Sequence, residues 1–161
     1  MNRPIQLRFA AAALGLAVGL SGCAPSFPAD PEATLDRVSG GTLRVGISPN
    51  GEWTDITDEG EASGIEVTLV EGFAETIDAE VAWVEGGEEQ LFTQLHEGTL
   101  DMVIGGLTDK TPWVNKGAVT KPFAEVTTST GVERHVMATA MGENAFLLEL
   151  EQFLLNQEGA P

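Results

Sequence analysis

The stretch Leu95-His96-Glu97-Gly98-Thr99-Leu100-Asp101-Met102-Val103-Ile104-Gly105-Gly106-Leu107-Thr108 decides the fold of this chain. It runs from an apolar-periodic segment, through a glycine that stops a helix, into a run that is apolar throughout its centre. Such a run is typical of a strand buried on both faces, as in a parallel sheet. The stretch therefore predicts a helix that ends near Gly98 and a buried strand over residues 101–107.

The residues on the amino-terminal side alternate between strand and helix patterns. Val70, Phe73, Ala74 and Ile77 repeat at the i, i+3, i+4, i+7 spacing of an amphipathic helix. The full set of predicted elements is a strand over 43–48, this helix, a strand over 80–85 and a helix over 88–97. This β-α-β-α-β order, which continues into the strand over 101–107, predicts an α/β fold with a mostly parallel sheet and covering helices.

The carboxyl-terminal third is expected to add to the same sheet. We predict strands over residues 118–123 and 135–140 and a last helix over 144–157, with Glu143-Asn144 as its N-terminal cap region. The Thr/Ser-rich segment 125–133 is polar and predicts a loop. The sequence shows no internal repeat.

The amino terminus has the anatomy of a secretory signal peptide. Arg3 and Arg8 precede a twelve-residue apolar run, which ends in Leu20-Ser21-Gly22-Cys23. The run is too short to span a membrane. A buried structural cysteine is the usual role of a lone cysteine, but Cys23 lies between this run and a Pro-rich segment, where no core is expected.

The Leu-Ser-Gly-Cys ending resembles a bacterial lipobox, which implies cleavage before Cys23 and acylation of its sulfur. The chain would then be exported and held to a membrane by lipid, facing the periplasm or the cell exterior. Residues 1–22 are the expected signal peptide, and residues 23–41 the lipidated cysteine and a flexible tether. Three prolines and a terminal Gly-Gly favour a linker there, and 18 flexible residues span about 25 Å.

Composition narrows the possible partners. Removal of residues 1–22 takes away two of the eight basic residues and no acid, which leaves 6 basic against 25 acidic residues, or −19. Such a surface repels nucleic acid and anionic lipid head groups, and it could favour a cationic ligand or a basic partner. With its single cysteine acylated, the mature domain has no disulfide and must be stable by packing alone.

Four separated signatures carry a family resemblance. They are Gly41-Thr42-Leu43-Arg44-Val45-Gly46, Gly64-Ile65-Glu66-Val67-Thr68-Leu69, the stretch 95–108 and Lys121-Pro122-Phe123. In this order they resemble the first lobe of the bacterial extracellular solute-binding proteins, family 3, which serve polar amino-acid uptake. The resemblance covers residues 41–124, and residues 135–155 look like the strand and helix that return to the first lobe. It implies a single-lobe, three-layer sandwich of the periplasmic-binding-protein type 2 kind over 42–158 and a role in membrane transport.

The chain departs from the family pattern in two ways. Only about ten residues, 125–134, stand where a second lobe would be inserted, and ten residues cannot form a lobe. The family's amino-acid binders also carry an Arg after the Gly-Leu-Thr element, where this chain has Thr108-Asp109-Lys110-Thr111-Pro112-Trp113. Lys110 could offer a single positive charge but not the two parallel hydrogen bonds that a planar arginine guanidinium donates to a carboxylate. Amino-acid binding is therefore not carried over from the resemblance.

Candidate binding residues lie at the expected carboxyl ends of the strands, where open parallel sheets bind ligands. They are Trp53, Glu66, Thr108, Asp109, Thr111 and Trp113. Each has a structural alternative: the tryptophans could anchor loops, Glu66 could stabilise the start of a helix, and the others could form turns.

The residue pattern does not support a metal site, a catalytic site or a phosphate-binding loop. The acids in 52–61 lack EF-hand spacing and favour a solvated loop over a metal site. Neither His96 nor His135 has a nucleophile at catalytic spacing, and no phosphate-binding glycine loop occurs. We therefore expect neither an enzymatic activity nor a cofactor.

Two functions remain open on the sequence. The first is a lipid-anchored receptor domain, associated with a membrane transporter, that binds a small polar ligand weakly in a half-cleft. The second is a non-catalytic accessory module that docks a membrane-protein partner, or a second copy of itself, through exposed Trp53 and Trp113.

Overall fold

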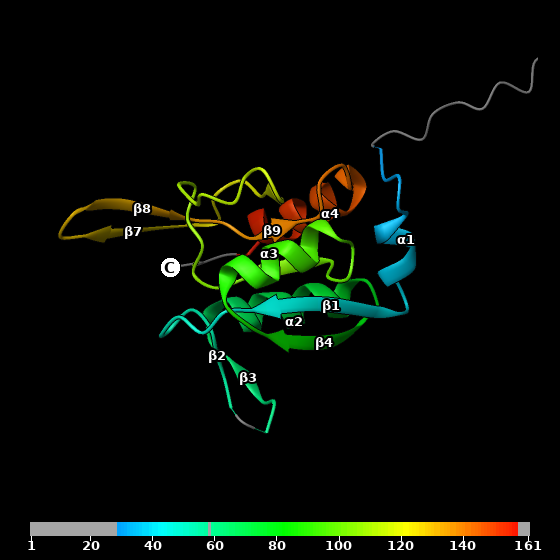
Figure 1. Ribbon diagram of the computed structural model, residues 1–161, viewed down its shortest axis with the longest axis horizontal. Coiled ribbons are helices and arrows are strands. Elements are labelled where there is room, and N and C mark those ends of the chain that lie inside the picture. Colours follow the sequence, from blue (N-terminus) through cyan, green and yellow to red (C-terminus); the bar gives the residue numbers. More distant parts are fainter. Residues whose placement is uncertain (1–28, 58, 158–161) are drawn as a thin grey trace, which may run out of the picture.

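The computed structural model describes residues 29–57 and 59–157, which form one lobe (Figure 1). The predicted signal peptide and Cys23 lie outside these residues. The elements are α1 (Thr34–Val38), β1 (Thr42–Ile47), β2 (Asp55–Ile56), β3 (Ala62–Ser63), α2 (Ile65–Thr76), β4 (Glu80–Glu85), α3 (Glu88–His96), β5 (Met102–Ile104), β6 (Ala118–Val119), β7 (Ala124–Thr128), β8 (Gly131–His135), β9 (Ala138–Thr139) and α4 (Asn144–Leu155). Within the described part, no helix is long and apolar enough to cross a bilayer.

A five-stranded sheet in the order β4-β1-β5-β9-β6 forms the middle layer. β1 pairs in parallel with β4 and β5, whereas β9 is antiparallel to β5 and β6. The predicted α/β class and mostly parallel sheet are therefore confirmed. The strand expected over 101–107 is shorter, because the chain turns at Gly105-Gly106, where Gly106 has a left-handed φ of 64°.

Helices cover both faces of this sheet, so the lobe has three layers. Leu43, Val45 and Ile47 of β1 point to one side, where α2 and α4 add their apolar residues to the core. On the other side, α3 packs Leu91, Phe92 and Leu95 onto Val103. Gly46 faces the α3 side, where a Cβ would lie 2.8 Å from Leu100 Cδ1 and 3.1 Å from Leu91 Cδ2, so a larger residue would have to displace these side chains.

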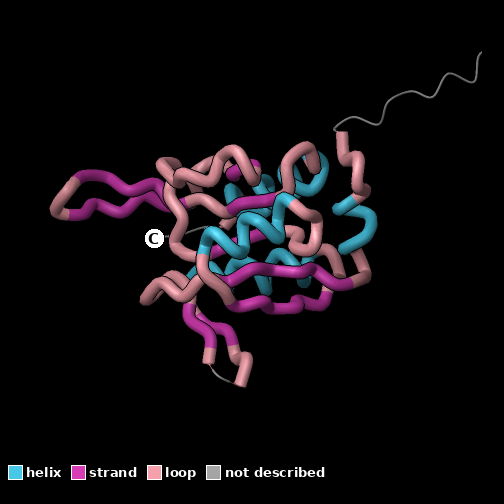
Figure 2. Tube along the Cα trace, viewed as in Figure 1, coloured by secondary structure: helices cyan, strands magenta, loops and turns pink. Residues whose placement is uncertain are grey.

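The loop predicted over 125–133 is wrong, because these residues form most of an antiparallel hairpin, β7–β8. The strands pair from Ala124 opposite His135 to Thr128 opposite Gly131, with two residues at the tip. Val126, Thr127 and Thr128 are β-branched residues that suit a strand, although the polar composition hid the pattern. The hairpin projects away from the body of the lobe, as does the short β2–β3 hairpin, which begins in the expected acidic loop 52–61 and ends just beyond it (Figure 2).

The linker predicted over 24–41 is also wrong for its described part, because residues from Ala29 onward belong to the fold. The carbonyl of Ala29 accepts the N–H of Asn144, and Val38 of α1 is fully buried in the core. Arg37 of α1 pairs with the buried Asp101. Five residues between Pro- and Gly-rich flanks give too short a pattern to reveal a helix in the sequence.

Glu143 has a different role from the one predicted. Its side chain makes no capping hydrogen bond at α4. Instead its two carboxylate oxygens accept the N–H groups of Glu32, at 3.0 Å, and Thr34, at 3.1 Å, so Glu143 fixes the start of α1. The partners lie more than a hundred residues away in the chain, which is why local reasoning assigned the carboxylate to the helix it precedes.

Candidate functional site at the carboxyl ends of the strands

Glu66 lies at the centre of the edge where β1 and β5 end. It is the second residue of α2, it is fully buried, and its Oε2 accepts the N–H groups of Gly105, at 2.8 Å, and Gly106, at 2.9 Å. The two amides follow directly on β5, so the carboxylate ties the start of α2 to the end of a central strand. This contact adds a long-range role to the helix-start role expected for Glu66.

Burial changes the acidity of Glu66. Loss of water contact raises the pKa of its carboxyl to about 7, and the two glycine N–H groups oppose this shift by stabilising the anion. Oε1 has no protein partner. Since Gly105 and Gly106 already donate to Glu66, these amides are not available to an anionic ligand.

Trp53 is buried behind this edge rather than exposed on it. Only 9% of its surface is accessible, and its ring stacks on the imidazole of His135 at 3.7 Å between centroids and 19° between planes. Phe123 meets the indole edge-on. Burial lowers the pKa of His135, although the nearby charge of Glu133 opposes the effect. The expectation that Trp53 is exposed is therefore wrong, because the hairpin residue His135 covers it.

The loop after Gly106 carries three of the predicted residues, and two of them contact the base of the β7–β8 hairpin. Thr108 forms an isolated bridge with His135, and the N–H of Asp109 donates to the carbonyl of Arg134. The guanidinium of Arg134 also contacts the Asp109 carboxylate at 3.4 Å and Glu125 at 2.9 Å. Thr111 is buried, and its hydroxyl has no protein partner.

Trp113 belongs to a separate contact on the α3 side of the lobe. Its Nε1 donates to Glu88 at 2.8 Å, and its ring stacks on Phe92. The ammonium of Lys116 lies 5.4 Å from the centre of the same ring and donates to Thr93. These contacts fasten the loop to α3. Trp53 and Trp113 therefore do not form the shared exposed surface that the docking hypothesis requires.

A groove of about 230 Å³ lies between the loop and the hairpin. It is lined by Thr108, Lys110, Thr130, Gly131, Val132 and Glu133. Of the predicted residues only Thr108 lines it. The hairpin residues were missed because they were assigned to a loop, and the alternation of Val126 and Thr128 was the signal that could have revealed them.

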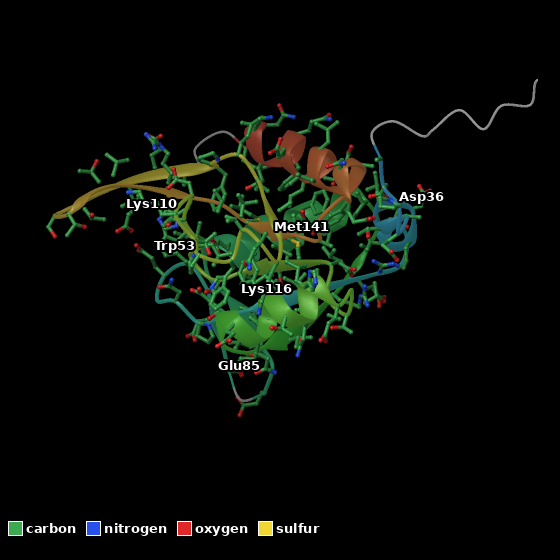
Figure 3. The ribbon with its side chains drawn as sticks, turned by 45° about the horizontal axis from the view of Figure 1, so that its top comes forward. Asp36, Trp53, Glu85, Lys110, Lys116 and Met141 are labelled. Carbon is green, nitrogen blue, oxygen red and sulfur yellow. The ribbon has the colours of Figure 1, made fainter. Side chains whose placement is uncertain are left out.

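Lys110 is unusual among the basic side chains of the described part of the chain. Arg37 and Arg44 pair with Asp101, Lys121 pairs with Glu151, Arg134 pairs with Asp109 and Glu125, and Lys116 binds Thr93 and Trp113. Within the described ranges, Lys110 alone has no side-chain partner. Figure 3 shows Lys110 and Trp53 at the same end of the molecule.

The groove has the chemistry of a site for a small zwitterionic or polar solute. It offers an ammonium from Lys110, a carboxylate from Glu133 and hydroxyls from two threonines. The described residues contain no group of three or more His, Cys, Asp or Glu side chains arranged to hold a metal ion.

Comparison with known structures identifies the fold. A mutant of the arginine-bound form of domain 1 from TmArgBP has a TM-score of 0.65 and 23% identity, over 74% of this chain and 95% of that one. The L-cystine solute receptor of Neisseria gonorrhoeae, in its unliganded open conformation, has a TM-score of 0.62 and 10% identity, over 75% of this chain and 89% of that one. The first match confirms the single-lobe architecture, since it is to one domain.

No protein of curated function matches the chain in sequence. The profile of the bacterial extracellular solute-binding proteins, family 3, matches residues 43–155, which is most of the chain and runs from the second residue of β1 to the end of α4. The chain therefore belongs to family 3 of the bacterial extracellular solute-binding proteins.

Proposed function

We propose that this chain is an exported lipoprotein, anchored through Cys23, whose single lobe binds a small polar solute without converting it. The unpaired Lys110 in the groove beside the β7–β8 hairpin carries the proposal. An unpaired cation is conspicuous in a chain with 25 acids and 8 bases. Lys110 would bind a carboxylate of the solute, and Glu133 would bind an amino group.

The single-lobe architecture is compatible with binding. Domain 1 from TmArgBP is described in an arginine-bound form, so one lobe of this fold can hold a ligand. The acidic surface of the present chain favours a cationic solute such as arginine. One wall buries less of a ligand than two, so we expect weak binding.

Isothermal titration of the mature domain tests solute binding. The panel comprises amino acids, polyamines and organic acids, each up to millimolar concentration. We expect heat with cationic amino acids, and a loss of affinity of about two- to five-fold in Lys110→Ala, as for one partly exposed ion pair. Lys121→Ala is the matched control, because Lys121 is exposed but pairs with Glu151 elsewhere. No measurable heat of binding with any compound of the panel would contradict the proposed solute binding.

The anchor is tested separately. The chain expressed with residues 1–22 should lose them, gain the mass of acyl chains on Cys23 and fractionate with membranes. Cys23→Ala should abolish both the added mass and the membrane association. An unmodified Cys23 in a cell-associated, soluble product would contradict the lipoprotein assignment.

A further inference from the structure

We propose that the groove beside the β7–β8 hairpin binds a short extended peptide, which adds its main chain to the outer edge of β8 while its carboxyl terminus pairs with Lys110. The inference rests on the proposed solute binding and names the class of solute. Three features carry it: the direction in which β8 presents its main-chain groups, the point at which the preceding loop leaves β8, and the ammonium of Lys110 at that point.

The main-chain groups of β8 face β7 and the outer edge in alternation. The carbonyl of Arg134 accepts the N–H of Asp109, and the N–H of Val136 donates to the carbonyl of Leu107. These two residues therefore present their main chain away from β7. Because the direction of the main-chain groups repeats every second residue along a paired strand, the N–H and the carbonyl of Val132 also point away from β7.

The loop covers the base of this outer edge and leaves the edge open at Val132. It runs antiparallel to the strand where Thr108 meets His135. It then turns away, since the N–H of Thr111 donates to the carbonyl of Thr108. Within the described residues, no main-chain hydrogen bond joins the loop to Val132, whose side chain is 44% exposed and lines the groove. An open strand edge of this kind is a template for pairing with another chain.

Lys110 sets the direction and the length of the bound peptide. It follows Asp109, so it lies where the loop leaves β8, on the side of Val132 that is nearer the base of the hairpin (Figure 3). A peptide whose carboxyl terminus meets Lys110 and which extends toward the tip runs parallel to β8. In parallel pairing, the N–H of Val132 donates to the carbonyl of one peptide residue, and the carbonyl of Val132 accepts the N–H two residues later. A tripeptide is therefore the shortest ligand that makes both hydrogen bonds and the ion pair.

Pairing through the main chain suits a groove with one wall. In strand addition, the main-chain hydrogen bonds supply the affinity, whereas side-chain pockets supply the specificity. The groove has few side chains that could select a sequence, although the carboxylate of Glu133 favours a cationic residue. The expected ligand is therefore a short peptide with a free carboxyl terminus and little sequence preference beyond positive charge.

Isothermal titration of the mature domain with Ala-Arg-Ala and with free arginine tests the inference. We expect the tripeptide to bind about ten-fold more tightly, because it adds two main-chain hydrogen bonds. N-methylation of its third residue removes the N–H that faces Val132 and should weaken binding about five-fold. N-methylation of its second residue is the matched control, because that N–H points away from β8, and it should change the affinity by less than about two-fold.

A second series tests the ion pair at Lys110. Amidation of the tripeptide's carboxyl terminus should weaken binding about two- to five-fold, as should Lys110→Ala with the free peptide. The two changes together should cost no more than either one, because each removes the same ion pair. Additive losses would overturn the contact between the carboxyl terminus and Lys110.

The remaining outcomes separate this inference from the proposed solute binding. Arginine that binds as tightly as the tripeptide overturns the peptide and leaves solute binding in place, whereas no binding of either compound overturns both. Equal effects of the two N-methyl groups overturn pairing with β8, and a larger effect at the second residue overturns the parallel direction. A dimer in sedimentation that the tripeptide does not dissociate would assign the edge to a second copy of the chain.

Discussion

At the residue scale, Glu66 holds together the edge of the sheet where β1 and β5 end. Its carboxylate joins the start of α2 to the two amides that end β5. The sequence predicted a role at the helix start but not this contact, because the glycines lie about forty residues away. A carboxylate in the first turn of a helix, followed by a buried strand that ends in Gly-Gly, is the signal that could have suggested it.

Glu66 should give the fold a pH dependence that Glu66→Gln lacks. Since the pKa of the buried carboxyl rises from 4.5 to about 7 on folding, its contribution to stability is fully present below pH 4.5 and is lost as pH rises through about 7. The loss reaches at most about 1.4 kcal/mol per pH unit. Urea unfolding at several pH values measures the difference between the two proteins.

The control for this series is Glu71→Gln, which removes an exposed carboxylate from the same helix. Its difference from the parent should stay nearly constant with pH. A flat difference for Glu66→Gln as well would show that the Glu66 carboxylate is hydrated and ionised in the folded protein.

Trp53 should behave as a core residue. Trp53→Ala removes a ring that stacks on His135 and meets Phe123, so we expect the unfolding free energy to fall by about 3 kcal/mol. Val114→Ala, at a side chain that is 55% exposed in the same lobe, should change it by less than about 0.5 kcal/mol. Similar small effects in both variants, measured by denaturant unfolding, would place Trp53 on the surface after all.

At the scale of elements, the sequence predicted what local periodicity encodes. β1, β4, α2, α3 and α4 match their predicted positions closely, since each has a clear apolar period and an end signal. α1 and the β7–β8 hairpin were missed because α1 is held by Asp101 and Glu143 from distant parts of the chain, and the hairpin is rich in polar residues. The groove could not be predicted, since one of its walls is that hairpin.

The hairpin should contribute little to global stability. Val132 of β8 is 44% exposed, so Val132→Ala should cost less than about 0.5 kcal/mol. The same truncation at the fully buried Val103 of β5 should cost about 1 to 3 kcal/mol, because it leaves a cavity. Thermal or urea unfolding compares the two. An equal cost would mean that the hairpin belongs to the core.

The Asp101 cluster should be what joins α1 to the sheet. Burial alone would raise the pKa of Asp101, but hydrogen bonds from Arg44 and Arg37 lower this pKa below its usual value of 3.8. The ionised carboxylate therefore contributes to folding stability above pH 3.8, and this contribution is lost as the pH falls and Asp101 is protonated. Asp101→Asn should cost about 2 kcal/mol at neutral pH, less than a fully buried pair because both arginines reach solvent.

The control for Asp101→Asn is Asp109→Asn, which weakens an ion pair with Arg134 on the surface. It should cost no more than about 1 kcal/mol. Amide exchange of residues 34–38 should accelerate in Asp101→Asn alone. Unchanged exchange there would mean that Val38 and Glu143 suffice to hold α1.

At the scale of the whole molecule, the lobe contains what an independent domain needs. One core lies between the sheet and the α1, α2 and α4 layer, and a second lies between the sheet and α3. The β7–β8 hairpin stands where the family resemblance implies a second lobe, and its tip closes the chain in two residues. The proposed solute site therefore has one wall, from which we expect weak binding and fast exchange.

Nuclear magnetic resonance of the ¹⁵N-labelled mature domain, titrated with arginine to millimolar concentration, tests the central claim most directly. Solute binding in the groove predicts fast-exchange shifts confined to residues 105–111 and 130–135, with amplitudes reduced in Lys110→Ala and unchanged in Lys121→Ala. Saturable shifts centred elsewhere, or no shifts at millimolar arginine, would contradict it.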